Sequence, residues 1–283
     1  MALDVQRVRA EFPALALTHD GRPRIYFDNP AGTQVPELVL TRMRETMVER
    51  LANMHGVFRT SVEATELAHQ AHEVMADFYN GNPDGVVNDR FDMLGVMGGR
   101  SHADFVTPEY STTAGSRKWE VCRGIGRSFG YNRMESEATF PTVDEQIWMV
   151  ADIVARGGNL LLNVGPSADG QIPMAQVVRL TALGWWLRIN GEAIFHTSPG
   201  GTSTTGDGRP VGFTHRDSTT FAIVQGAPSG EVSFPLDRPA EGTEVRMLGN
   251  DRVLPHQWHD GHLRVQMPDH LPAAPATVFA VKA

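Results

Sequence analysis

GGNLLLNVGPSADG, residues 157–170, is the part of this 283-residue chain that says most about its fold. Its apolar run, from Leu160 to Val164, has the composition of a buried strand. The turn residues that follow, beginning with Gly165 and Pro166, are typical of a tight loop. In parallel α/β barrels the active site lies at the carboxyl ends of the strands. The stretch therefore predicts a parallel strand that leads into a functional loop.

Helices are predicted on both sides of this strand. Thr142 and Glu145 have the spacing of a capping box, so we expect a helix from there to Arg156. Pro173 suits the first position of a second helix, which should end near Gly191. This alternation of strand and helix is typical of the closing part of a parallel α/β barrel.

The rest of the chain has two other sequence patterns. Before Gly85 the sequence predicts a short strand over 24–27 and three helices, at 4–11, 36–53 and 61–79. The stretch 197–208 is rich in Thr, Gly and Ser and is expected to be a linker. After it, short β-prone runs separated by turn residues predict an antiparallel sandwich. These runs are 211–215, 219–225, 231–235, 243–248, 262–267 and 277–282.

The predicted fold class is therefore α/β plus all-β, in three parts. A mostly helical segment occupies 1–85, the closing portion of a (β/α)8-like barrel occupies 86–198, and a C-terminal β-sandwich occupies 199–283. A complete barrel needs about 250 residues, more than this middle part provides. Because a partial barrel exposes strand edges and an apolar face, we expect self-association through those edges.

Composition excludes several classes of function. The net charge is −8 and no Lys/Arg cluster stands out, which argues against a nucleic-acid partner. No apolar run is long enough to span a membrane, and the first residues do not have a signal-peptide pattern, so a cytoplasmic protein is expected. The single cysteine, Cys122, permits no internal disulfide and is expected to be a small core residue. No metal is expected, because the histidines of the C-terminal part read as surface residues: His256, His259, His262 and His270.

Five motifs occur in the order found in one enzyme family. They are VVNDR (86–90), DFVTPEY (104–110), KWEVCRGIGRSFGYNR (118–133), GNLLLNVGPSADG (158–170) and GWWLRINGEAIFHT (184–197). With these motifs, residues 85–283 resemble the α-L-fucosidases of glycoside hydrolase family 29. The resemblance implies a (β/α)8-like barrel followed by a β-sandwich. It also implies retaining hydrolysis of terminal α-L-fucose, and hence a fucose-containing carbohydrate as partner.

The resemblance suggests three site residues. Arg90 matches the arginine that contacts the sugar, Glu109 the acid/base glutamate of some members, and Phe129 the aromatic that packs against the sugar. Purely structural roles are the alternative for two of them: Arg90 would form an ion pair with Asp89, and Glu109 would be a solvated loop carboxylate. Retaining hydrolysis needs two carboxyl groups. The Trp-rich segment that carries the family's aspartate nucleophile is not found, so the nucleophile is unassigned and impaired activity is expected.

The N-terminal segment resembles a different family. VRAEFPAL (8–15), RIYFDNPAGTQVP (24–36) and ADFYNGNPDG (76–85) are similar to the start of class V aminotransferases, which use pyridoxal phosphate. That chemistry needs a Schiff-base lysine, and Lys118 and Lys282 do not lie in that family's context. No cofactor is therefore expected. The junction near residue 85 is compatible with a natural fusion or with a mis-joined reading frame.

Two functions of different classes follow from these observations. The first is an α-L-fucosidase-like glycoside hydrolase, and the second is a non-catalytic carbohydrate-binding or interaction protein. A pyridoxal-phosphate protein is the least favoured reading, because its lysine is not identified. The glycines of RGIGRSFG (123–130) do not have the spacing of a dinucleotide motif and are expected to permit close packing at a strand.

Overall fold

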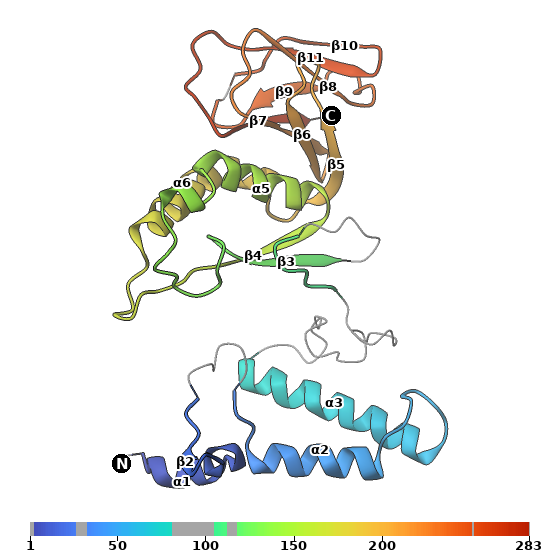
Figure 1. The fold of residues 1–283 in the computed structure, drawn as a ribbon. Coiled ribbons are helices and arrows are strands. Elements are labelled where there is room, and N and C mark those ends of the chain that lie inside the picture. The colour runs from blue at the N-terminus through green and yellow to red at the C-terminus, as the bar shows by residue number, and fades with distance from the viewer. Residues whose placement is uncertain (1–2, 27–32, 81–104, 112–117, 251, 283) are drawn as a thin grey trace. The chain divides into compact units, whose positions relative to one another are not determined.

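The computed structural model describes residues 3–26, 33–80, 105–111, 118–250 and 252–282 (Figure 1). The chain divides into two compact units, Met1–Gly85 and Val86–Ala283. The first unit is mainly helical, and the second combines helices with parallel and antiparallel strands.

The first unit contains one short hairpin and two longer helices. Its elements are α1 (Val5–Ala10), η1 (Pro13–Ala16), β1 (Thr18–His19), β2 (Arg22–Pro23), α2 (Glu37–Glu49) and α3 (Arg59–Tyr79). The three predicted helices are thus confirmed, whereas the strand predicted over 24–27 is wrong for its described residues 24–26. Asp20 and Gly21 both have positive φ, as a two-residue hairpin turn requires, so the strands pair immediately on either side of them.

Among its described residues, 3–26 and 33–80, this first unit has almost no buried side chains. Ser61 is the only buried residue of α1, α2 and α3, and its hydroxyl donates to the Asn53 carbonyl and accepts from Gly56 N–H. Large apolar side chains remain exposed on α2 and α3, among them Leu38, Met43, Met47, Val74 and Phe78. Within this unit, therefore, the helices are not stabilised by an apolar core of their own.

The second unit begins with parallel strands. β3 (Trp119–Gly124) and β4 (Gly158–Asn163) pair in parallel, and residues 105–111 add bridges from Val106 to Trp119 and from Glu109 to Cys122. The helix α5 (Val143–Ala155) connects the two strands. This arrangement agrees with the predicted α/β class, while its assignment to the closing portion of a (β/α)8-like barrel stays a prediction.

The helix ends follow the predicted caps. The Thr142 hydroxyl accepts from Glu145 N–H, and the Glu145 carboxylate accepts from Thr142 N–H, which is the predicted capping box. After β4 the helix α6 (Met174–Asn190) begins directly behind Pro173. Short 3₁₀ turns, η3 (Glu137–Thr139) and η4 (Gly191–Ala193), precede α5 and follow α6.

Two antiparallel sheets form the C-terminal part, as the upper region of Figure 1 shows. The five-stranded sheet has the order β5 (Ser198–Thr204), β6 (Pro210–Arg216), β7 (Thr219–Gln225), β12 (Ala276–Lys282) and β9 (Glu244–Met247). The three-stranded sheet has the order β10 (His256–His259), β11 (His262–Gln266) and β8 (Glu231–Pro235). One apolar core joins both sheets, so the predicted sandwich is confirmed.

Two predictions about this part were wrong. The expected linker 197–208 contains the edge strand β5, which pairs with β6 through a bulge at Pro199/Gly201. The stretch 256–259, which is not among the predicted β-prone runs, forms β10, which pairs with β11 across the positive-φ turn residues at 260–261. Both are edge strands, whose pairing depends on a neighbour rather than on local composition.

The helices cover the second face of the five-stranded sheet. In β7, Ala222 and Val224 enter the sandwich core, whereas Phe221 and Ile223 pack with residues of α5 and α6. On another side of α5, Ile153 packs with residues of β3. Helix α5 therefore packs between the parallel strands and the sandwich. This packing fixes the position of β3, whose carboxyl end forms part of the candidate site.

Candidate functional site

The candidate site lies at the carboxyl ends of the parallel strands. Trp119 and Val121 of β3 are 2% exposed and pack on Ile153 of α5. Because successive residues of a strand point to opposite faces, Glu120 and Cys122 lie on the face away from α5. Glu109 is the bridge partner of Cys122, so it lies on that same face.

Two glutamates therefore share one face of the sheet. Glu109 is exposed and Glu120 is half-buried. Strands lie about 4.8 Å apart and rise about 3.3 Å per residue, which places two Cα atoms on neighbouring strands and two residues apart in level at about 8 Å. Glu120 is the second residue of β3, so it lies two residues further from the carboxyl end of the strand than Cys122, the bridge partner of Glu109.

Phe129 lies beside Glu109's neighbour, Tyr110. The two rings meet edge to face, with centroids 5.2 Å apart and an interplanar angle of 67°. The Asn163 side-chain amide, at the end of β4, donates to the Phe129 carbonyl. The structure thus brings together residues from three different segments: Glu109 with Tyr110, Phe129, and Asn163.

Tyr110 has an unusual backbone at this edge. Its φ is +52°, a left-handed conformation that costs free energy in a bulky residue and that often marks functional sites. The Gly124 N–H donates to the Tyr110 hydroxyl at 3.0 Å, and the Arg123 guanidinium lies 5.2 Å from the ring centroid. These contacts stabilise the ring against the end of β3.

Glycines let the loop after β3 pack against the strand ends. A Cβ on Gly124 would lie 2.1 Å from the Ser128 carbonyl oxygen, and one on Gly165 would lie 2.6 Å from the backbone of Gly130. A Cβ on Gly126 would lie 2.5 Å from a carboxylate oxygen of Glu135. The prediction that glycines of this motif permit close packing at a strand is confirmed for Gly124, whereas Gly126 leaves room for the Glu135 carboxylate in the loop and a Cβ on Gly130 would meet nothing within 4 Å.

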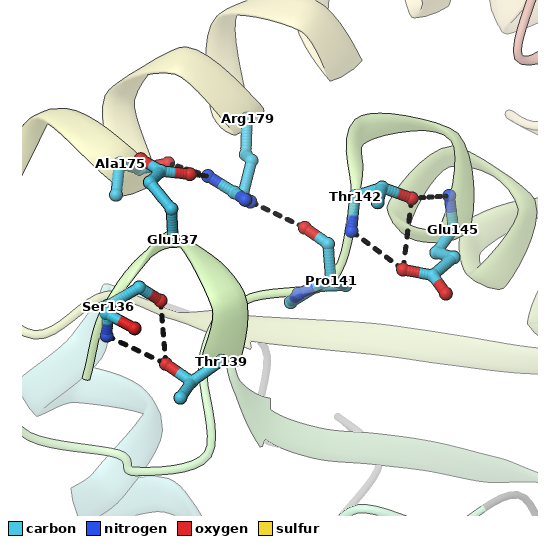
Figure 2. A network of polar contacts seen from close by, with 8 residues as sticks. All are labelled: Ser136, Glu137, Thr139, Pro141, Thr142, Glu145, Ala175 and Arg179. Atoms are coloured by element: carbon cyan, nitrogen blue, oxygen red, sulfur yellow. Dashed lines mark hydrogen bonds and ion pairs between the residues drawn. The ribbon is translucent and has the colours of Figure 1, made fainter.

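A buried arginine anchors the end of this loop to α6 (Figure 2). The Arg179 side chain is 8% exposed. Its Nε donates to the Pro141 carbonyl at 2.6 Å, and its Nη1 donates to the Ala175 carbonyl at 2.8 Å and to the Glu137 carboxylate at 3.0 Å. The adjacent N–H and hydroxyl of Thr142 lower the pKa of the Glu145 carboxyl. The segment 136–145 is therefore fixed by polar contacts on both sides.

The predicted site residues have different outcomes. Arg90 and its neighbour Asp89 lie outside the described residues. Glu109 and Phe129 lie in adjacent segments at one sheet edge, and Cys122 is half-buried on the same face as Glu109. The roles of these residues stay predictions.

The described residues also bear on metal, membrane and Schiff-base functions. No group of three or more His, Cys, Asp or Glu side chains could hold a metal ion there. Among the C-terminal histidines, His256 is half-buried and His259, His262 and His270 are exposed. No helix in the described ranges is long and apolar enough to cross a membrane. The side chains of Lys118 and Lys282 are exposed.

Two clefts lie away from this edge. An apolar cleft of about 540 Å³ includes Trp185 and Ile189 of α6 and Pro272. A more polar cleft of about 630 Å³ includes Arg216 and Glu244 of the five-stranded sheet. Neither contains Glu109 or Phe129.

Three residues of the site were missed by the sequence reasoning. Glu120 alternates with the buried Trp119 and Val121, and this alternation was a usable signal once the strand was recognised. Tyr110 follows Glu109 in the quoted motif, but only its backbone conformation distinguishes it. Glu135 acts through backbone contacts, and the sequence contained no signal for those.

Known proteins resemble this chain over most of both units. The α-L-fucosidase family model matches residues 24–192. An α-L-fucosidase of Branchiostoma floridae is 34% identical over 174 residues, which cover 58% of this chain and 38% of that protein. The α-fucosidase of Thermotoga maritima in complex with fucose is 30% identical with a TM-score of 0.63, covering 92% of this chain and 60% of that one. An α-L-fucosynthase of the same organism is 35% identical with a TM-score of 0.63, covering 77% and 48%.

These matches identify a family of glycoside hydrolases. The chain belongs to the α-L-fucosidase family, because the family model matches more than half of it. The match begins at residue 24, so it includes α2 and α3 of the segment that also resembles class V aminotransferases. The aminotransferase resemblance stays a prediction. The chain spans about two fifths of the length of the curated relatives it matches.

Proposed function

We propose that this chain acts on terminal α-L-fucose as a retaining glycoside hydrolase, with Glu109 as its acid/base. The observation that carries the proposal is the position of Glu109 at a parallel strand end, beside the ring pair of Tyr110 and Phe129. A carboxyl group next to aromatic rings suits a sugar, because the rings pack on its apolar face while the carboxyl group reaches the glycosidic oxygen. The fucose complex of the Thermotoga relative supports the same sugar.

The proposed chemistry uses Glu109 twice. As an acid it donates its proton to the glycosidic oxygen while the bond from that oxygen to the anomeric carbon breaks. As a base it then removes a proton from the water that attacks the same carbon. Phe129 packs against the sugar, and Arg90, by resemblance, binds its oxygen atoms.

Retention needs a second carboxyl group close to the first. Glu120 is the described carboxylate that strand register puts on the same face as Glu109, one strand away. We include Glu120 in the proposal as the residue to test for this role, since the aspartate used by the family was not found in the sequence.

Hydrolysis of an aryl α-L-fucoside tests the proposal. Glu109→Gln is expected to lower turnover about 10²- to 10⁴-fold, the usual contribution of an acid/base group. Added azide should restore release of the aryl group and give the α-fucosyl azide, because azide replaces the water without needing a base. If Glu120 attacks the anomeric carbon, Glu120→Gln with azide should instead give the β-fucosyl azide. Asp144→Asn, an exposed carboxylate of α5, is the matched control.

The second candidate function is carbohydrate binding without turnover. It is favoured by the combination of a retained aromatic pair with an unassigned nucleophile. Fucose binding in calorimetry with no hydrolysis by the wild-type chain would support it and refute the hydrolase. A chain that neither binds nor hydrolyses fucosides would refute both.

A further inference from the structure

The carboxylate of Glu135 holds together the loop that contains Phe129. Oε1 of Glu135 accepts hydrogen bonds from the backbone N–H groups of Arg127, at 2.7 Å, and Ser128, at 3.0 Å. These are the two residues immediately before Phe129. A carboxylate that accepts from backbone N–H groups makes stronger hydrogen bonds than a neutral acceptor, so this contact fixes the backbone that leads to the ring.

The sequence leaves space for this carboxylate. A Cβ on residue 126 would lie 2.5 Å from Oε2 of Glu135 and 2.8 Å from its Oε1. Gly126 has no Cβ, and the carboxylate occupies that position against the backbone. Any larger residue at 126 would push Glu135 away from the two N–H groups.

Phe129 is also held on its other side. The Asn163 side chain donates to the Phe129 carbonyl, and the Asn132 side chain donates to the Ser128 hydroxyl at 3.0 Å. The ring then meets Tyr110. The backbone of Phe129 is thus fixed by Glu135 on its N-terminal side and by the end of β4 on its carbonyl side.

We propose that Glu135 is a positioning residue for sugar binding, acting through Phe129. Glu135 does not touch the sugar; it holds residues 127–128 so that the Phe129 ring stands edge to face with Tyr110 beside Glu109. The inference rests on the proposed function of the site and adds to it a determinant of substrate affinity. Removing Glu135 therefore changes binding, whereas removing Glu109 changes the chemical step.

A double-mutant cycle tests this role. Glu135→Ala is expected to raise the KM for an aryl α-L-fucoside, and the Kd for fucose, about tenfold, an effect of about 1.4 kcal/mol, and to change kcat less than about threefold. Glu135→Gln keeps an acceptor oxygen and should recover most of the affinity. Phe129→Ala should match Glu135→Ala, and the double variant should be no worse than Phe129→Ala, because both changes remove one interaction. Asp144→Asn again controls for the loss of one charge.

The outcomes separate the two proposals. Fucose binding by the wild-type chain with unchanged affinity in Glu135→Ala overturns the positioning role alone. Additive losses in the double variant also overturn it, because they would show that Glu135 acts independently of Phe129. A wild-type chain that neither binds nor hydrolyses fucosides refutes the proposed function, and the positioning role with it. If Glu135→Ala does not fold, Glu135→Gln replaces it in the cycle: its smaller loss of affinity should disappear in the Phe129→Ala background, and a loss that persists there overturns the positioning role.

Discussion

Replacing Arg179 by Met should destabilise the unit from Val86 to Ala283. Arg179 has an almost fully buried side chain that donates to the carbonyl groups of Pro141 and Ala175 (Figure 2). Methionine fills similar space without a donor. The substitution therefore leaves the Pro141 carbonyl, before α5, without this donor, whereas the Ala175 carbonyl keeps the backbone hydrogen bond of α6 and loses only its second donor.

The size of the effect follows from the individual contacts. A hydrogen bond from a charged donor contributes about 1.5–3 kcal/mol. The ion pair to Glu137, whose side chain is 73% exposed, adds at most about 1 kcal/mol, and the contact with the Phe140 ring about 0.5–1 kcal/mol. Removing a buried charge returns part of its desolvation cost, which leaves a net loss of about 3 kcal/mol.

Thermal unfolding measures this loss. For a unit of about 200 residues, 3 kcal/mol corresponds to a Tm lower by about 6–12 °C. Glu137→Gln removes only the exposed ion pair and should shift the free energy of unfolding by no more than about 1 kcal/mol. If Arg179→Met unfolds within 1 °C of the wild type, the two carbonyl groups do not depend on Arg179, and the anchoring argument is refuted.

Three further outcomes are expected. Thr142→Ala removes the cap of α5 and should lower the free energy of unfolding by about 1 kcal/mol in urea; an unchanged midpoint would contradict this. Hydrogen bonds from the Thr205 hydroxyl and then from Arg209 lower the pKa of Asp207 in the folded chain. The stabilisation that Asp207 contributes is therefore complete above the ordinary carboxyl pKa and is lost as the pH falls through the lowered pKa. Asp207→Asn should reduce the loss of stability at acid pH, and an unchanged pH dependence would contradict the assignment. We propose that the chain self-associates through the exposed edges of the parallel sheet; light scattering should show a mass above that of one chain, and a wild-type monomer would refute it.

The sequence predicted the elements whose signals are local. The capping box at Thr142 and the proline before α6 act within one helical turn, so both helix starts were found. The other sandwich strands, including the edge strands β8 and β9, have apolar β-prone patterns and were found as well. The edge strands β5 and β10 were not, because their residues form strands only through pairing with β6 and β11.

The residues of the candidate site also fall into those with a local sequence signal and those without one. Glu109 and Phe129 were proposed from family motifs, which are short and contiguous. The partnership of Glu109 with Glu120 depends on the register of two strands, and the contact of Glu135 with residues 127–128 depends on a loop that folds back over Gly126. Such relations are set by tertiary structure, so a sequence pattern does not express them.

The packing of α5 explains how loops can form a defined site here. Binding residues on loops are accurately placed only when the elements beneath them are rigid. Helix α5 packs on β3 through Ile153 and on the sandwich through Ile147 and Val150, so it cannot shift without opening an apolar core. The loop before α5 is fixed to this frame by Arg179 at one end and by Glu135 near Phe129 at the other. Changes at these two anchors should therefore differ: loss of Arg179 weakens the frame, whereas loss of Glu135 leaves the frame stable and weakens the hold on the sugar.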